Sequence, residues 1–144
     1  RLNCKKKTYR YIINNSKEGS AIYRNLETHI PQKLNVEKMK QAIKYFEGEH
    51  DFKAFKASGT SSKSSVRKIY NAEVYEKDDR IYIELTGNGF LYNMVRIITG
   101  TLVEVGIGKI SPEEIPEIIK QGKRENAGKT LPPNGLYLVK VMYE

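Results

Sequence analysis

Arg96 is the residue whose surroundings in the sequence most clearly point to chemistry. It lies in a long apolar stretch, residues 85–106, where it is the only charge before Glu104. A buried guanidinium is costly, and arginine cannot avoid that cost by losing its proton as lysine can. We therefore expect Arg96 to meet a carboxylate or a phosphate. The alternative is a surface arginine that packs its stem against the protein and keeps its charged end in water.

Clustered basic residues are a second sign of a binding partner. The sequence has 25 Lys and Arg residues against 17 Asp and Glu residues, a formal net charge of +8. This excess favours a polyanionic partner, and nucleic acid is the first candidate. We expect several of the clustered cations to hold RNA phosphates. The candidates are Lys5, Lys6, Lys7, Arg10, Lys53, Lys56, Lys63, Arg67 and Lys68.

Cysteine and histidine are scarce in this sequence. Cys4 is the sole cysteine, and His29 and His50 are the only histidines. No internal disulfide and no Cys/His zinc spacing can be assembled from them. We therefore expect no metal or cofactor and a reducing, cytoplasmic setting. There is no run of about 18 apolar residues, so we expect no membrane span.

A long helix must carry Arg96. The apolar residues of the stretch 85–106 fall on two neighbouring helical stripes that begin at Phe90 and Leu91, so the helix should be largely buried. Residues 86–89, Thr-Gly-Asn-Gly, supply turn and cap chemistry just before it. Gly106 is placed to end it as a left-handed residue.

The remaining elements follow strand and helix patterns. We expect strands at residues 8–13, 66–76, 80–86 and 136–143, and helices at residues 36–46 and 112–121. The last strand is a nearly continuous apolar run, which is typical of a strand buried on both faces. This order predicts one α+β domain, residues 1–144, with a mainly antiparallel sheet and helices on one face.

Four segments of the sequence resemble motifs of the TruA-type tRNA pseudouridine synthases, in that family's order. They are residues 7–11 (KTYRY), 48–52 (GEHDF) with Phe55, 89–102 (GFLYNMVRIITGTL) and 135–139 (GLYLV). The resemblance covers essentially the whole chain but only the second half of such an enzyme. It therefore implies the C-terminal domain of a tRNA pseudouridine synthase.

The resemblance implies an isomerase that converts uridine to pseudouridine in the anticodon stem-loop of tRNA. In that family Tyr9 corresponds to the active-site tyrosine that packs on the target base, and Arg96 to the arginine that pairs with the catalytic aspartate. Considered alone, Tyr9 is an ordinary strand tyrosine, half-buried in the sheet. Tyr11 is expected to face the opposite side of the strand from Tyr9.

The catalytic aspartate itself is expected to lie elsewhere. The family's Gly-Arg-Thr-Asp motif does not occur in this sequence, whose only aspartates are Asp51, Asp78 and Asp79. The N-terminal half that holds this motif is therefore expected to be absent, and this chain alone to be inactive. The resemblance also implies a homodimer of the full-length enzyme.

Two other classes of function stay open at this point. The chain could be a stand-alone RNA-binding module without catalysis, or an interaction domain that dimerises through an apolar face. It lacks the Lys/Arg-Gly-Phe/Tyr-Gly/Ala-Phe signature of RNA-recognition modules. The segment from His50 to Phe55 is similarly open, because its residues could satisfy backbone groups and fill the core or could shape the basic loop that follows.

Overall fold

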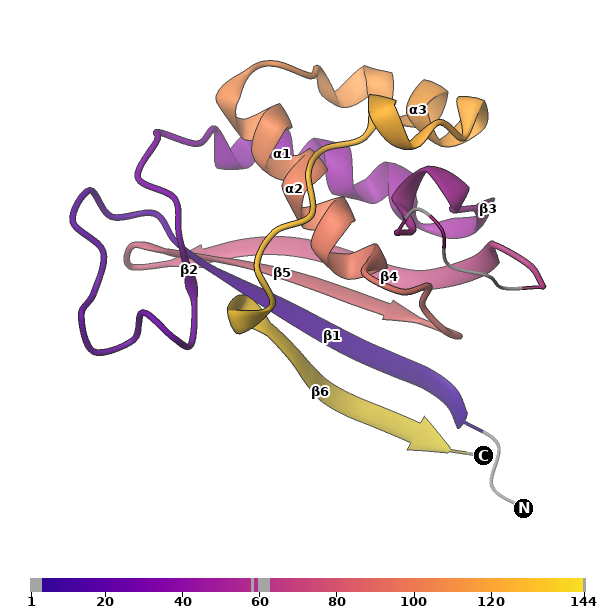
Figure 1. Ribbon diagram of the computed structural model, residues 1–144, viewed down its shortest axis with the longest axis horizontal. Helices are drawn as coiled ribbons and strands as arrows, with labels where there is room; N and C mark the ends of the chain where they lie inside the picture. Colours follow the sequence, from indigo (N-terminus) through magenta and orange to yellow (C-terminus); the bar gives the residue numbers. More distant parts are fainter. Residues whose placement is uncertain (1–3, 58, 60–62, 144) are drawn as a thin grey trace.

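The computed structural model describes residues 4–57, 59 and 63–143. It contains one six-stranded sheet with helices on one face (Figure 1). The strands are β1 (Cys4–Asn14), β2 (Thr28–His29), β3 (Gly48–Asp51), β4 (Val66–Lys77), β5 (Arg80–Gly87) and β6 (Leu136–Tyr143). The helices are α1 (Val36–Ile43), α2 (Met94–Ile107) and α3 (Ile115–Gln121). The predicted α+β class is confirmed.

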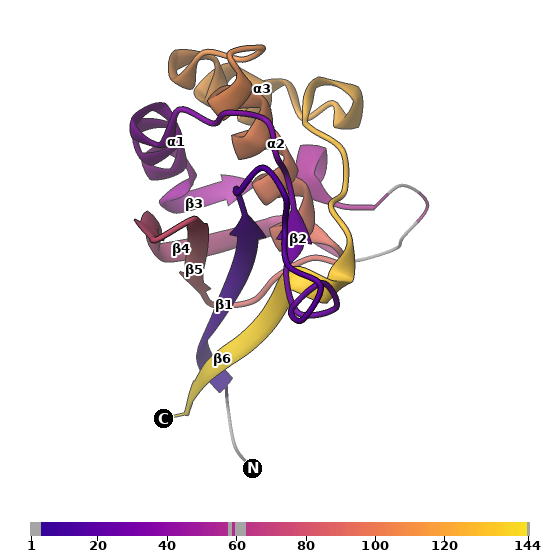
Figure 2. The same cartoon turned by 90° about the vertical axis from the view of Figure 1, so that its left-hand side faces the viewer.

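The sheet has the order β2-β1-β5-β4-β3, and β6 also pairs with β1. Within the described residues every pairing is antiparallel except that of β1 with the short β2. The helices lie above the part of the sheet formed by β3, β4 and β5, and β6 is at the edge farthest from them (Figures 1 and 2). The strands β2 and β3 were not predicted, because each is too short to show an alternating pattern.

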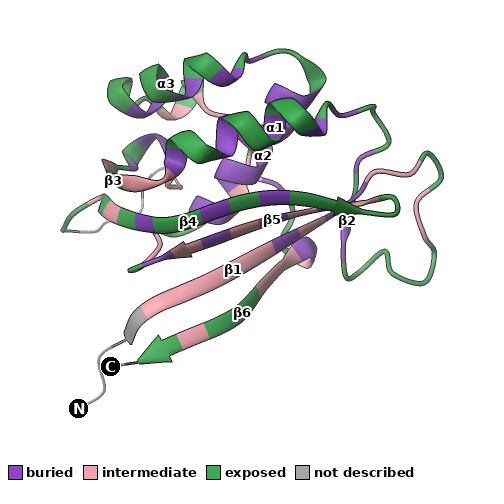
Figure 3. Cartoon of the chain, turned by 180° about the vertical axis from the view of Figure 1, so that it is seen from behind, coloured by how far each residue is buried: buried purple, intermediate pink, exposed green. Residues whose placement is uncertain are grey.

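The core lies between the helices and the face of the sheet that they cover. Along β5, the buried residues Ile81, Ile83 and Leu85 alternate with the less buried Tyr82 and Glu84. Helix α2 is buried along most of its length, as predicted, and the outer surfaces of α1 and α3 are exposed (Figure 3). The sheet thus has one covered face and one open face, as antiparallel sheets commonly do.

The caps of α1 and α3 were predicted correctly. Asn35 is the N-cap of α1, and its side chain accepts a hydrogen bond from the Lys38 amide at 3.1 Å. Ser111 and Glu114 form a capping box, and Gly122 ends α3 in the left-handed conformation. These features depend on neighbouring residues alone, which is why the sequence pattern is sufficient.

The predicted boundaries of α2 were wrong at both ends. Residues 86–89 do not cap it, because β5 extends to Gly87 and the N-cap position is Asn93. Phe90 and Leu91 lie in the loop before the helix, and the left-handed residue that ends it is Gly108, with φ 102°. Gly106 lies inside the helix, where a Cβ atom would come within 2.9 Å of the Met39 sulfur. Two glycines lie near this end of the helix. Gly106 allows α1 to pack closely against α2, and Gly108 ends the helix.

The prediction that β6 is buried on both faces was also wrong. Leu138 is 52% exposed, Met142 40% and Tyr143 56%. The strand is at the sheet edge and is largely exposed along its length (Figure 3). An apolar run shows that a strand can be covered, but within the described residues only the start of β6, at Leu136, packs against the core.

The segment from His50 to Phe55 serves the core. Phe52 and Phe55 are fully buried and contact each other edge to face. A ring nitrogen of His50 bonds the Glu47 carbonyl at 2.8 Å, and Asp51 accepts from the Lys53 amide at 3.2 Å. These contacts favour the structural interpretation of the segment.

Candidate active site

Tyr9 and Arg96 line the same cavity, although β1 and α2 are far apart in the sequence. The cavity has a volume of about 360 Å³, and its lining consists of Tyr9, Phe90, Leu91, Tyr92, Asn93, Met94, Val95, Arg96, Pro133 and Leu136. The walls are mainly apolar and aromatic, with a guanidinium and an amide among them. Such a lining is typical of a pocket for a small planar ligand.

Tyr9 is held on the helix-covered face of the sheet. Its neighbours across the strands are Leu85 on β5 and Leu138 on β6, and its ring packs edge to face on Phe90 at 5.1 Å between centroids. Tyr9 is half-buried, and among the described residues its hydroxyl has no hydrogen-bond partner. The ring is therefore fixed while the hydroxyl stays available.

The expectation that Tyr11 faces away from Tyr9 was wrong. Residues two apart in a strand share a face, and both tyrosines contribute to the core side of β1. Tyr11 is fully buried, and its hydroxyl donates to the Pro132 carbonyl and bonds the Thr28 hydroxyl, both at 2.6 Å. Burial raises the pKa of the Tyr11 hydroxyl, and the Thr28 hydrogen bond and the positive charge of Arg96 oppose that change.

Arg96 is half-buried, and two neutral groups hold its guanidinium. Nε donates to the Leu131 carbonyl at 2.7 Å, and Nη1 donates to the Asn93 side-chain oxygen at 2.8 Å. The expected carboxylate or phosphate is not found among the described residues. The guanidinium is not surrounded by water alone either, because Nε and Nη1 both donate hydrogen bonds within the protein.

A segment that runs along α2 supplies the Leu131 carbonyl. The Leu131 amide in turn donates to the Arg96 carbonyl, and the Gly128 amide donates to the Thr101 hydroxyl at 2.8 Å. The close approach needs glycine on the helix, since a Cβ on Gly100 would overlap the Lys129 carbonyl. The segment is thereby fixed on α2, and Arg96 is fixed with it.

Three predicted basic residues lie beside the loop that precedes α2. The side chain of Arg67 lies against Gly89, and Lys68 and Asn88 exchange two hydrogen bonds at 2.9 and 3.0 Å. Lys56 precedes Ala57, whose amide donates to the Tyr92 carbonyl. Lys56, Arg67 and Lys68 therefore flank the loop that lines the cavity.

The other predicted basic residues are more dispersed. The amino group of Lys6 lies 4.6 Å from the centroid of the Tyr70 ring, which it shares with the amino group of Lys68 at 5.3 Å. Arg10 pairs with Glu84 at 2.6 Å on the open face of the sheet, and this hydrogen bond raises the pKa of Arg10. Lys53 packs against Gly122 beyond α3. Lys7 is half-buried in β1, Lys63 is exposed, and the Lys5 side chain lies outside the described part of the chain.

Sequence reasoning missed several residues of the cavity. Phe90 was expected on a helix, but it lies in the loop and contacts Tyr9. Asn93 and the Leu131 carbonyl were not singled out, although both bind Arg96. The only signal for Asn93 was its position three residues before Arg96, and nothing local could point to Leu131.

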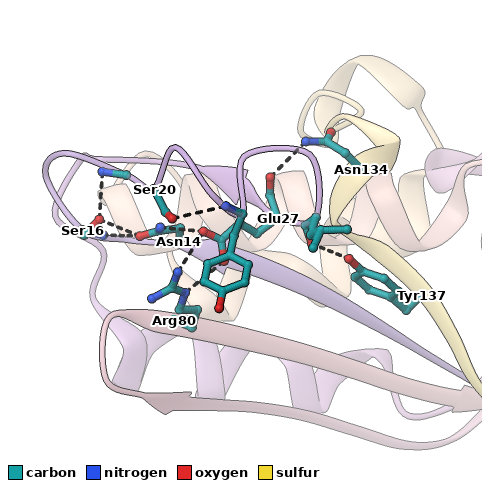
Figure 4. A network of polar contacts seen from close by, with 10 residues as sticks. Asn14, Ser16, Ser20, Glu27, Arg80, Asn134 and Tyr137 are labelled. Carbon is teal, nitrogen blue, oxygen red and sulfur yellow. Dashed lines mark hydrogen bonds and ion pairs between the residues drawn. The ribbon is translucent and has the colours of Figure 1, made fainter.

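A second guanidinium lies in a polar network at the other end of β1 (Figure 4). Arg80 donates to both oxygens of Glu27, at 2.9 and 3.1 Å, and Asn14 donates to Glu27 at 2.7 Å. The Glu27 side chain is only 7% exposed. This network joins the loop before β2 to the β4–β5 hairpin and was not predicted from the sequence.

Within the described residues, three or more His, Cys, Asp or Glu side chains never converge into a possible metal site. None of the described helices is both long enough and apolar enough to cross a membrane.

Comparison with known proteins agrees with the motifs in the sequence. A family model for tRNA pseudouridine synthase matches residues 42–144. The chain is 56% identical over 144 residues to tRNA pseudouridine synthase A of Ruminiclostridium cellulolyticum, covering 99% of this chain and 59% of that protein. The enzyme of the same name from Acetivibrio thermocellus is 52% identical over 143 residues, with the same two coverages. This chain therefore spans 59% of the length of these relatives, and it belongs to the TruA-type tRNA pseudouridine synthase family.

Proposed function

We propose that this chain is the C-terminal domain of a tRNA pseudouridine synthase and contributes Tyr9 and Arg96 to its active site. The reaction breaks the bond between a nitrogen of the uracil ring and its ribose and rejoins the ribose to a ring carbon. That carbon loses a proton and the released nitrogen gains one, so the product is an isomer of the substrate. The reaction needs a carboxylate near the sugar. The observation that carries the proposal is that Tyr9 and Arg96 line one cavity of about 360 Å³, which is large enough for a single base.

In this proposal Arg96 receives a carboxylate that comes from outside the described chain. Its guanidinium already has fixed neutral partners, and Nη2 has none among the described residues. An arginine held in this way can orient a carboxylate and favour its ionised form. The partner would be the catalytic aspartate of the N-terminal half.

Tyr9 and Phe90 provide the surface for the base. A uridine in the anticodon stem-loop must leave the base stack to be reached, and the exposed base then packs on aromatic rings. Tyr9 has a fixed ring and a hydroxyl without a partner among the described residues. It can therefore contact the base and take part in proton removal from the ring carbon.

Basic residues near the cavity would hold the tRNA backbone. Lys56, Arg67 and Lys68 have the strongest support, because they flank the loop that lines the cavity. Tyr92, which is 67% exposed on the same loop, offers a further ring on which an unpaired base can stack. Of the remaining candidates, Lys7 pairs across the sheet with Gly87, directly before this loop, and the charge of Arg10 is already compensated by Glu84.

The exposed edge of the sheet supports the presence of a further segment. Native proteins rarely leave a long apolar edge strand uncovered, because it would pair with other chains. β6 is such a strand, and the relatives are longer than this chain, which spans 59% of their length. We propose that the N-terminal half covers β6 and that the complete enzyme works as a homodimer in the cytoplasm.

The direct test is a tritium-release assay with unmodified tRNA. The isolated chain is expected to release no tritium, because Tyr9 and Arg96 do not replace the missing aspartate, and the full-length enzyme is expected to turn over. Clear turnover by the isolated chain would overturn the assignment of the nucleophile to the other half. A reading frame without a Gly-Arg-Thr-Asp segment upstream would instead favour an RNA-binding module.

A binding isotherm at several salt concentrations tests the RNA surface. The isolated chain is expected to bind tRNA weakly, with log affinity falling as log salt rises, because neutralised phosphates release counterions. Replacing Lys68 with alanine should reduce the slope by about one. The same change at Lys38, an exposed residue of α1, is the control and should leave the slope unchanged.

A further inference from the structure

Asn93 has a backbone conformation that asparagine adopts only occasionally. Its φ is 64°, and Asp78 is the only other residue apart from glycine with positive φ in the described part of the chain. Asparagine tolerates this left-handed region better than most residues, at a cost in free energy. Strained residues of this kind cluster at functional sites, where the surrounding structure holds them in place.

The two asparagines that begin helices in this chain use their side chains differently. Asn35 has an extended backbone and caps α1, accepting a hydrogen bond from the Lys38 amide. Asn93 stands at the same position before α2, but its side chain makes no capping hydrogen bond. Its side-chain oxygen accepts from Arg96 Nη1 at 2.8 Å instead. The cap interaction is therefore given up for a contact with the guanidinium.

The hydrogen bonds of Arg96 leave one end of the guanidinium open. The group has five N–H donors, of which Nε–H binds the Leu131 carbonyl and one Nη1–H binds Asn93. Both Nη2 hydrogens and the second Nη1 hydrogen have no partner among the described residues. With Nε occupied, the free donors are on the end formed by Nη1 and Nη2.

We propose that Asn93 is a positioning residue, which together with the Leu131 carbonyl orients Arg96 so that the catalytic carboxylate binds the Nη1–Nη2 end. This inference rests on the proposed function of Arg96. Both partners are neutral, so they fix the guanidinium without neutralising it. A carboxylate at the position of Asn93 would bind Arg96 itself and compete with the catalytic one. An amide provides the acceptor without that competition.

The test compares variants of the full-length enzyme by single-turnover rate, tRNA affinity and melting temperature. Asn93→Gly keeps the left-handed backbone and removes the acceptor. It is expected to lower the single-turnover rate by on the order of 100-fold, because a slightly misplaced catalytic group is enough for such a loss. The tRNA affinity and the melting temperature should stay the same. Asn93→Asp should lower the rate as well, because the new carboxylate pairs with Arg96.

Two matched variants separate positioning from a structural role. Asp78→Gly makes the same change at the other strained position and should leave the rate unchanged. Asn35→Gly removes a true helix cap and should lower the melting temperature slightly, since glycine is itself tolerated at an N-cap, without a specific loss of rate. A wild-type rate in Asn93→Gly, or a loss no larger than that of Asn35→Gly, would overturn the inference. An Arg96→Met enzyme that remains active would contradict the proposed function itself.

Discussion

Arg80 and Arg96 are both partly buried, but the protein holds them in different ways. Arg80 donates two hydrogen bonds to Glu27, whose side chain is 7% exposed, and the pair lies in a network that fixes the loop before β2 (Figure 4). Arg96 has a backbone carbonyl and an amide oxygen as its partners. The first guanidinium has its carboxylate within the chain, and the second has none in the described residues.

This difference indicates that Arg80 and Arg96 have different roles. A charge pair that is complete within one domain serves folding, because its partner is present whenever the domain is folded. A guanidinium fixed by neutral groups keeps its positive charge uncompensated at the wall of a cavity. Such a group costs more to maintain, and it is suited to a carboxylate that arrives with another part of the protein.

The comparison is tested most strongly by Arg96→Met in the full-length enzyme. Under the proposed function turnover should be lost, because the catalytic carboxylate loses the ion pair proposed to orient it. A single-turnover assay measures this, and a thermal melt of the same variant shows that the enzyme is still folded. Activity close to that of the unmodified enzyme would show that Arg96 does not serve catalysis.

The second test asks whether the Arg80–Glu27 pair stabilises the fold. Arg80→Met should lower the free energy of unfolding of the isolated chain by about 3 kcal/mol, because the nearly buried Glu27 carboxylate loses its charge partner. Urea denaturation measures the change. Adding Glu27→Gln should recover part of the loss, since the remaining group is then neutral. If the single variant were as stable as the starting chain, the Arg80–Glu27 pair would not be a folding element.

A third test uses the buried hydroxyl beside Arg96. The pKa of Tyr11 is raised in the folded chain, mainly by burial. Its contribution to stability is therefore complete below about pH 10, where tyrosine in the unfolded chain begins to ionise, and it is lost as the pH rises through the folded-state pKa. Tyr11→Phe should make the alkaline fall in unfolding free energy shallower, by up to about 1.4 kcal/mol per pH unit. Denaturation curves from pH 8 to 11 would show identical slopes if Tyr11 does not contribute.

The smallest expected effect is that of Arg96→Met on the isolated chain. The variant loses two hydrogen bonds but also removes a half-buried charge that has no carboxylate partner in the described residues. These effects oppose each other, so the unfolding free energy should change by no more than about 1 kcal/mol. The measurement is the one used for Arg80→Met. A loss as large as that of Arg80→Met would mean that Arg96 is a structural residue.

Predictions from the sequence succeeded where the physical cause is local. Asn35, the Ser111 capping box and Gly122 were identified from neighbouring residues alone. The end of α2 was misplaced, because Gly106 and Gly108 are equivalent in a local pattern. Only the packing of α1 against Gly106 distinguishes them.

Two residues of the candidate site were named from the sequence, and their roles stay predictions. Family motifs drew attention to Tyr9 and Arg96, and the cavity that both residues line is consistent with that expectation. The groups that hold Arg96 could not be found in the same way, because Leu131 contributes only a backbone carbonyl. Every residue has a backbone carbonyl, so the identity of residue 131 does not indicate this contact.

The sequence by itself determined the longer strands and helices of this protein apart from the exact ends of α2, its α+β class, its basic charge and its family motifs, since each of these follows from residue type and short-range spacing. The tertiary structure decided that Tyr9 and Arg96 share a cavity, that Asn93 binds Arg96 instead of capping α2, and that β6 is exposed. These depend on contacts between distant segments. Hydropathy indicates that a strand is apolar, but only the packed chain shows what covers it.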